Sequence, residues 1–252
     1  MKNRSYAVTT AFVLLVGAAL VTVDTVADAT TNRAAAQQSG TVGSEADRVT
    51  AADRVTAADR AAVADMDATA AKAAAQLSTT DGDVTASGTG RVAYFVFRKG
   101  RNPIDSRLGW YEYRTYPDRP PVLTYKSIHR AGSGDGTKDP CRTAHGWLPS
   151  GWYGGTFRTH FDGIINGIVW QLDNKRCKRG TLRTELFIHS EMTPSAGQNC
   201  GYEPECWNGP SDYYSAGCVK VRPSHIKAFA TRYRSYYGSR AERYRKRLLL
   251  VT

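Results

Sequence analysis

The stretch Arg91–Arg98, with the sequence RVAYFVFR, decides the fold class of this chain. It is rich in aromatic and β-branched residues and therefore predicts a β-strand. Similar short runs follow and are separated by clusters of Gly, Pro and Asp, such as Asp118–Pro121 and Gly132–Gly136. These further predicted strands are Trp110–Tyr116, Val122–His129, Gly155–Phe161, Gly167–Leu172 and Leu182–Ser190.

A single helix is predicted near the C-terminus. Pro223 and Ser224 form its start, because proline is favoured in the first turn of a helix. Apolar and aromatic residues then recur at i, i+3, i+7 and i+11, namely Ile226, Phe229, Tyr233 and Tyr237. Many short strands with one C-terminal-side helix predict a mainly β fold, a β-sandwich or barrel.

Bulky residues are concentrated in the C-terminal part of the chain. All five Trp, all five Cys and 13 of the 14 Tyr lie after Gly90. Residues 1–89 carry seven basic and ten acidic side chains, a formal charge of −3, and residues 90–252 carry 27 and 13, a charge of +14. Because a core needs bulky side chains to offset chain entropy, we expect one folded domain over residues 91–252.

The N-terminus has the features of a secretory signal over residues 1–29. Lys2 and Arg4 are its positive region, Ala11–Val21 is an apolar run too short to span a bilayer, and Ala27–Ala29 has the small–x–small pattern of a cleavage site. An uncleaved anchor over Ala7–Val23 is the alternative. Both interpretations predict that the domain is exported, and only the second attaches it to a membrane.

An Ala-rich, low-complexity linker is predicted over residues 30–90. The sequence Asp47–Ala52 is repeated at Asp53–Ala58 and decays from Asp59. A six-residue repeat advances a helix by about 600°, so successive repeats build no single apolar stripe. We therefore expect Gly40–Gly90 to be a tether, disordered or weakly helical, serving as a spacer or tolerating repeat slippage.

The cysteine count predicts two disulfides and one free thiol. Cysteines outside the cytosol tend to oxidise, and an odd number leaves one unpaired. Cys200 and Cys206 are close in sequence and can staple the loop Asn199–Pro210. Cys141 and Cys177 would then pair across strands, which leaves Cys218, although four cysteines allow three pairings.

Two segments carry the parts of a thiol acyl-transfer site. Leu186–Ser190 (LFIHS) is an apolar strand ending in His189, and Ser215–Val221 (SAGCVKV) presents Cys218 from a small-residue turn. Gly217 permits a tight turn, in which backbone N–H groups can face a developing oxyanion. A thiol is a weak nucleophile until an imidazole accepts its proton, so we assign Cys218 as the nucleophile and His189 as the base.

The order of these residues discriminates among families of cysteine enzymes. Papain-like proteases place Cys before His, and sortases require a Thr-Leu-x-Thr-Cys strand before the catalytic Cys. The chain resembles the L,D-transpeptidase (YkuD-type) family, whose signature is His-Gly/Ser followed by Ser-His-Gly-Cys, an apolar residue, and Arg or Asn. The matching positions are His189, Ser190, Ser215, Gly217, Cys218 and Val219, with Lys220 in place of Arg.

The resemblance covers Arg91–Phe229 and has two departures. Leu148–Tyr153 resembles the family's Thr-Pro-x-Gly-x-Tyr/Phe turn, and Val122–Gly132 resembles the strand before it. Ala216 replaces the family's second histidine, so that any help this histidine gives must be absent or come from elsewhere. The interval from His189 to Cys218 is stretched by the loop with Cys200 and Cys206, which is either a rim of the substrate groove or an inert insertion.

The resemblance implies an enzyme that forms 3→3 crosslinks between peptidoglycan stem peptides without metal or cofactor. Cys218 would attack the carbonyl of the third stem residue, with the Gly217 and Cys218 N–H groups as oxyanion hole. The carbonyl of Ser190 would hold the imidazole of His189. The predicted substrate-binding residues are Lys220, Arg222 and Ser215, with a solvated strand edge as the alternative for Lys220 and Arg222.

Several alternatives stay open. The same Cys–His pair would serve an L,D-carboxypeptidase or hydrolase, and the departure at Ala216 leaves room for a catalytically inactive wall-binding module. Asp212 either orients a histidine or holds a turn.

The basic run Arg240–Arg247 would suit nucleic acid, but in an exported protein anionic wall polymers are the expected partner. The other histidines that could act as base are His129, His145, His160 and His225.

Overall fold

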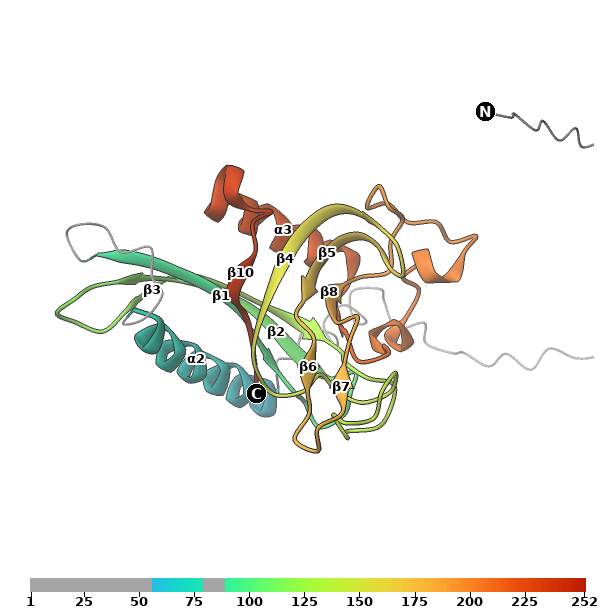
Figure 1. Cartoon of the computed structure of the whole chain (residues 1–252), viewed down its shortest axis with the longest axis horizontal. Helices are drawn as coiled ribbons and strands as arrows, with labels where there is room; N and C mark the ends of the chain where they lie inside the picture. The colour runs from blue at the N-terminus through green and yellow to red at the C-terminus, as the bar shows by residue number, and fades with distance from the viewer. Residues whose placement is uncertain (1–55, 79–88) are drawn as a thin grey trace, which may run out of the picture. The chain divides into compact units, whose positions relative to one another are not determined.

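A computed structural model of the chain describes residues 56–78 and 89–252 (Figure 1). These residues belong to one compact unit, Arg54–Thr252. The signal sequence or anchor predicted over residues 1–29 and the first copy of the repeat lie outside the described residues. Within residues 56–78 and 89–252, no helix has both the length and the apolar character needed to span a bilayer.

The described chain is mostly β, as the sequence predicts. A large mixed sheet of eight strands has the order β3-β2-β1-β10-β4-β5-β8-β9, and a small sheet pairs β6 with β7. The strands are β1 (Gly90–Arg98), β2 (Ser106–Thr115), β3 (Val122–Ala131), β4 (Gly151–Asp162), β5 (Asn166–Leu172), β6 (Lys175–Arg176), β7 (Leu182–Arg183), β8 (Phe187–His189), β9 (Val219–Lys220) and β10 (Arg245–Val251). The helices are α2 (Ala57–Ser78) and α3 (Pro223–Tyr237), and the 3₁₀ turns are η1 (Glu203–Glu205), η2 (Pro210–Tyr213) and η3 (Gly238–Arg240).

The two edges of the large sheet meet. Gly132, the residue after β3, forms an antiparallel bridge with Lys220 of β9. The Gly132 N–H donates to the Lys220 carbonyl at 2.9 Å, and the Lys220 N–H donates to the Gly132 carbonyl at 2.9 Å. The sheet therefore curls until its first and last strands join at one end, which is a barrel-like closure.

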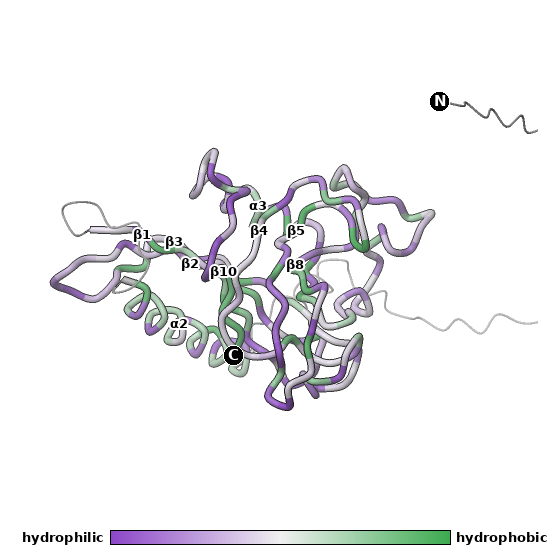
Figure 2. The backbone as a smooth tube through the Cα atoms, in the orientation of Figure 1, coloured by the Kyte–Doolittle hydropathy of each residue, from purple (hydrophilic) through white to green (hydrophobic). Residues whose placement is uncertain are grey.

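The strand β1 is buried on both faces because a helix covers each face (Figures 1 and 2). On one face Phe95 packs against Phe229 of α3 with ring centroids 5.3 Å apart. Trp110 of β2 contacts Tyr233 of α3 at 5.3 Å. This aromatic layer is the main core, and α3 begins at Pro223 as the sequence predicts.

The opposite face of β1 and β2 packs against α2, which differs from the tether predicted for residues 40–90. The buried residues of α2 recur at intervals of three and four and so form one apolar stripe, which the six-residue repeat upstream does not show. Tyr94 donates its hydroxyl to the Ala70 carbonyl at 2.5 Å. The stripe consists of Met66, Ala70, Ala73, Ala74 and Leu77. The folded unit therefore includes α2 as well as residues 91–252.

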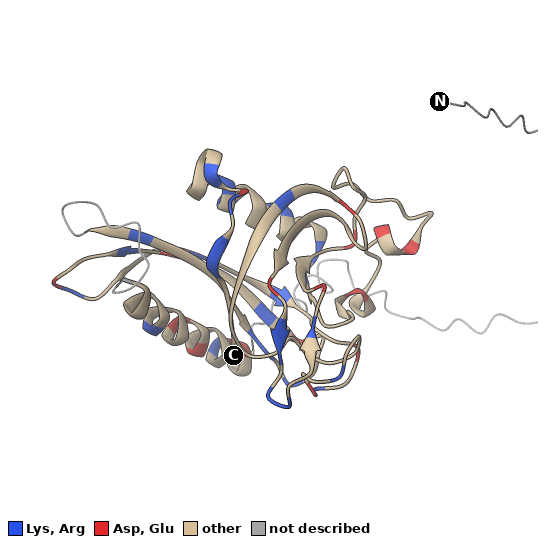
Figure 3. Cartoon of the chain, viewed as in Figure 1, with Lys and Arg blue, Asp and Glu red and all other residues tan. Residues whose placement is uncertain are grey.

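Carboxylates along α2 also meet basic side chains of the sheet (Figure 3). Asp65 pairs with Arg98 at 2.7 Å, and Asp67 pairs with Lys126 at 2.6 Å. Exposed ion pairs of this kind contribute about 0–1 kcal/mol each, so the apolar stripe provides most of the stability of this contact.

One further expectation needed correction, and one strand was not predicted. Arg240, Arg243 and Lys246 are exposed, as expected for a basic surface, and Arg245–Val251 forms β10 between β1 and β4 in the middle of the sheet. The predicted strand Leu182–Ser190 is divided into β7 and β8, because Glu185 between them has a φ of 53°. A strand cannot continue through a residue in the left-handed region.

The contact of α2 with the sheet can be tested with two adjacent alanines. Ala70 is fully buried and Ala71 is exposed. Ala70→Glu should lower the free energy of unfolding by about 2–4 kcal/mol, because it buries an unpaired carboxylate against β1 and β2. Ala71→Glu makes the same change in charge and should alter stability by less than about 0.5 kcal/mol. Equal urea midpoints for the two variants would contradict the packing of α2.

Candidate active site

The turn that carries Cys218 is fixed to the segment after β3. Ser215 donates its N–H to the Gly134 carbonyl at 3.0 Å. The hydroxyl of Ser133 donates to the Gly217 carbonyl at 3.2 Å. Together with the bridge between Gly132 and Lys220, these bonds hold both sides of the turn.

The hydroxyl of Ser215 forms three hydrogen bonds with backbone groups in and beside this turn. It accepts the N–H of Gly134 at 3.0 Å and the N–H of Gly217 at 3.1 Å, and it donates to the Cys218 carbonyl at 2.7 Å. Ser215 was assigned to substrate binding, but its hydroxyl is occupied by these three backbone groups. The N–H of Gly217, one of the two donors expected for the oxyanion, is likewise engaged, so the Cys218 N–H is the donor that remains from that expectation.

Gly217 is required at its position. Its φ of 112° is unfavourable for residues with a side chain, and a Cβ would lie 2.0 Å from Nη2 of Arg183. No sequence motif pointed to Arg183, although this buried arginine lies directly against the turn that carries Cys218. It comes from β7, in the small hairpin beside the pocket.

The cysteine pairing agrees with the prediction. Cys141 and Cys177 are bonded with Cα atoms 5.3 Å apart, and Cys200 and Cys206 are bonded with Cα atoms 4.6 Å apart. Both separations lie in the usual range for disulfides. Cys218 is the free cysteine and is buried. Two disulfides are compatible with an oxidising compartment.

Cys218 and His189 line the same pocket, which has a volume of about 530 Å³. The Cys218 thiol contacts the Glu185 carbonyl at 3.4 Å. Glu185 and Ala144, with φ values of 53° and 60°, both line this pocket and are strained, which is common where a backbone is shaped by function.

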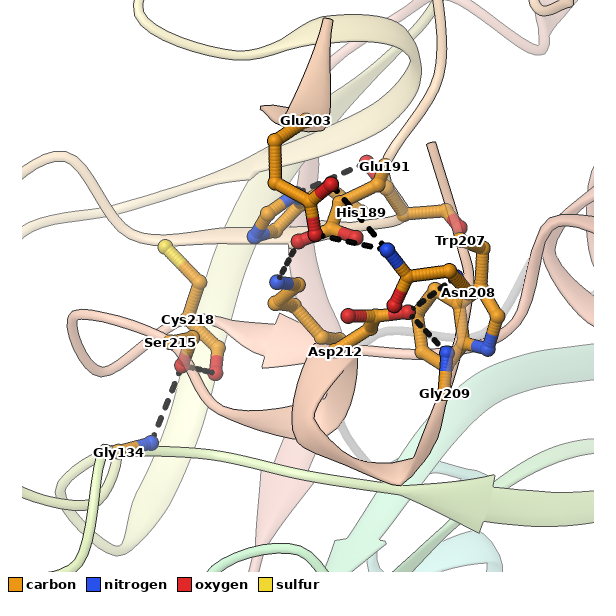
Figure 4. Close-up of polar contacts among 12 residues, drawn as sticks. Gly134, His189, Glu191, Glu203, Trp207, Asn208, Gly209, Asp212, Ser215 and Cys218 are labelled. Atoms are coloured by element: carbon orange, nitrogen blue, oxygen red, sulfur yellow. Dashed lines mark hydrogen bonds and ion pairs between the residues drawn. The ribbon is translucent and has the colours of Figure 1, made fainter. Parts of the chain in front are cut away.

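The orientation of His189 follows from one hydrogen bond. Its Nδ1 lies 3.2 Å from the Ser190 carbonyl, and because a carbonyl can only accept, Nδ1 carries the proton. Nε2 is then the basic nitrogen, and it is turned towards Cys218 (Figure 4). All five histidines lie in the described part of the chain, and His189 is the one that lines the pocket. The other four, His129, His145, His160 and His225, lie elsewhere.

Burial keeps both groups neutral at rest. Desolvation, and after it the charge of Lys220, lower the pKa of His189 to about 3, against a smaller opposite effect of the Ser190 carbonyl. Desolvation raises the pKa of Cys218 to about 11, although the backbone of Phe187 and then the charge of Arg183 act in the opposite direction. The resting site therefore holds a thiol and an imidazole, and no preformed ion pair.

The charged residues expected to bind substrate lie in different environments. Lys220 is buried in the pocket wall, where it forms an ion pair with Glu191. Arg222 is exposed at the N-cap of α3 and does not line the pocket. Asp212 accepts the N–H of Gly209 at 2.7 Å, so it holds a turn, one of the two roles considered for it.

The loop stapled by Cys200 and Cys206 forms part of the pocket rim. Tyr202 and Pro204, which lie inside the disulfide loop, line the pocket, and Tyr202 is 57% exposed. Ile164, on the turn between β4 and β5, also lines the pocket and is 67% exposed. Of the two roles considered for the loop, a rim and an inert insertion, the structure places it at the rim.

Comparisons of the chain with protein-family models, with curated proteins and with solved structures gave no match.

The neutral resting state predicts the pH dependence of alkylation. Because the pKa of Cys218 is raised, its thiolate should form only in alkaline solution, and the rate of modification by iodoacetamide should keep rising to about pH 10. The measurement is the alkylation rate against pH, with Cys218→Ala as the blank, together with the thiolate absorbance in the ultraviolet. A rate that levels off below about pH 8 would show a preformed thiolate.

Proposed function

We propose that this chain is an exported cysteine acyltransferase of the L,D-transpeptidase type, acting on peptidoglycan stem peptides. The observation that supports this best is the unpaired thiol of Cys218 in a pocket that it shares with His189, whose Nε2 is free to accept a proton. The residue order described above, His-Ser followed by Ser-x-Gly-Cys, supports the same family. The features of a secretory signal and the two disulfides support export.

The reaction is a two-step acyl transfer. As the Cys218 sulfur attacks the carbonyl of the third stem residue, Nε2 of His189 accepts the thiol proton and then gives it to the leaving amine of D-alanine. The carbon–nitrogen bond breaks and a thioester remains. The side-chain amine of a second stem attacks the thioester, loses a proton to His189 and releases the thiol. No electron is transferred, and no metal or cofactor takes part.

The pocket suits such a substrate in both polarity and shape. Ile164, Ile165 and Phe187 give one part of the wall an apolar surface, and Lys220 with Glu191 gives another part a charged one. A stem peptide has an aliphatic diamino side chain and free carboxylates, so it can contact both. The depth of the pocket keeps the thiol away from bulk water, which favours attack on the thioester by an amine that fits the site.

Reaction with a carbapenem tests the proposal directly. The wild-type chain should gain the mass of one intact antibiotic on Cys218, and Cys218→Ala should gain none. His189→Ala should be acylated about 10²–10⁴-fold more slowly near pH 7, because a positioned base is lost, and should recover in part at alkaline pH, where the thiol ionises unaided. Acylation of His189→Ala at the wild-type rate would show that another group is the base.

Purified stem peptides separate a transferase from a hydrolase. A tetrapeptide stem should give crosslinked dimer and D-alanine in equal amounts, because each thioester is resolved by an amine. A tripeptide product without dimer would assign the site to an L,D-carboxypeptidase. A folded wild-type chain that forms neither product nor adduct but sediments with peptidoglycan would be a wall-binding module.

A further inference from the structure

Arg183 joins three separate segments beside the nucleophile. The residue is 2% exposed, and its guanidinium donates only to backbone carbonyls. Nη1 contacts the carbonyls of Pro140 at 2.8 Å and Trp147 at 3.3 Å. Nη2 contacts the carbonyls of Gly146 at 3.3 Å and Ala216 at 3.2 Å. The planar fork of arginine fits this arrangement, which an ammonium group cannot reproduce.

The charge of Arg183 forms no ion pair among the residues that the structure describes, although the carboxylate of Asp139, which pairs with Arg179, acts on it from farther away. No carboxylate oxygen of the described residues lies within 4.0 Å, the limit for an ion pair, of the Arg183 guanidinium nitrogens. Arginine stays protonated even when it is buried, and a buried cation held mainly by backbone dipoles is costly. Such a cation favours any neighbouring group that becomes negative.

The Cys218 sulfur is the group beside Arg183 that becomes negative in the proposed reaction. Gly217 packs directly on the guanidinium, and Cys218 follows it. Of the other charged groups that face the thiol, Lys220 is balanced by Glu191, and Glu185 is negative and opposes a thiolate. His189 is neutral at rest.

We propose that Arg183 is a positioning residue for the acyl transfer proposed above: it holds the Ala216–Cys218 turn, and its charge stabilises the negative charge that develops on the Cys218 sulfur. The inference rests on that function. Arg183 donates a hydrogen bond to the carbonyl of Ala216 in this turn. Ala216 stands where the family that the sequence resembles has its second histidine. Arg183 thus provides from β7 the support that the motif lacks.

The test compares three variants in iodoacetamide alkylation, which requires no recognition of substrate. Arg183→Met removes the charge and should move the alkylation profile to higher pH by about 1 unit, with a roughly 10-fold lower rate near pH 8. Arg183→Lys keeps a charge without the fork and should leave the profile within about 0.3 unit while slowing carbapenem acylation about 10-fold. Arg176→Met removes an exposed charge from the same hairpin and should leave both measurements unchanged.

Folding is checked by near-ultraviolet circular dichroism and by the presence of both disulfides. A folded Arg183→Met with the wild-type profile would overturn the proposal. If Arg183→Met does not fold, Arg183→Lys decides, and a profile moved by about 1 unit in that variant would overturn it as well. If the wild-type chain forms no carbapenem adduct while the profile still moves in Arg183→Met, the acyltransferase function fails and the influence of Arg183 on the thiol stands.

Discussion

The closure of the sheet by Gly132 and Lys220 is the constraint on which the site depends. This bridge joins the end of β3 to β9, two strands that lie at opposite ends of the strand order. The turn that carries Cys218 therefore lies between them. Only glycine fits at position 132, because a Cβ there would lie 2.1 Å from the Tyr213 carbonyl. β8 lies on the other side of β9 in parallel register, with His189 opposite Lys220, so His189 ends one strand and Cys218 directly precedes its neighbour. The arrangement of these two side chains thus follows from strand pairing.

Local patterns were enough to predict most of the strands but not the two elements that complete the fold. Arg91–Arg98 and the runs after it lie in β1 to β5 and β8, because strands buried in a core have a distinctive composition. The packing of α2 on the sheet was not predicted, although a weak helix was one of the two expectations there, because its buried face consists mostly of alanine, which gives little hydropathy contrast. The strand β10 was missed because basic residues precede its short apolar part, and its parallel pairing with β1 joins opposite ends of the domain.

In the site, too, residues recognised from their sequence neighbours were predicted, and residues whose contacts lie far away in the sequence were not. Cys218 was predicted as the free thiol from its neighbours and from the odd number of cysteines, and these two arguments are independent. Arg183 could not be predicted, since a lone arginine in a basic hairpin gives no sign that it will be buried against a turn 33 residues downstream. The role of the Ser215 hydroxyl in holding the turn was not predicted for a similar reason, because one of its backbone partners, Gly134, lies 81 residues away.

In the exported protein proposed above, a buried, neutral thiol would also limit side reactions of the free cysteine. The thiolate is the species that attacks disulfides and is oxidised, and this chain carries two disulfides, one of them at the rim of the same pocket. With a pKa of about 11, on the order of 10⁻⁴ of the thiol is ionised at neutral pH. In the proposed reaction, substrate would change this balance, because it would bring an electrophilic carbonyl into the pocket where His189 can accept the proton, while the charge of Arg183 is already in place. Under that proposal, reactivity depends on the occupied pocket, and burial protects the free thiol of Cys218 while the pocket is empty.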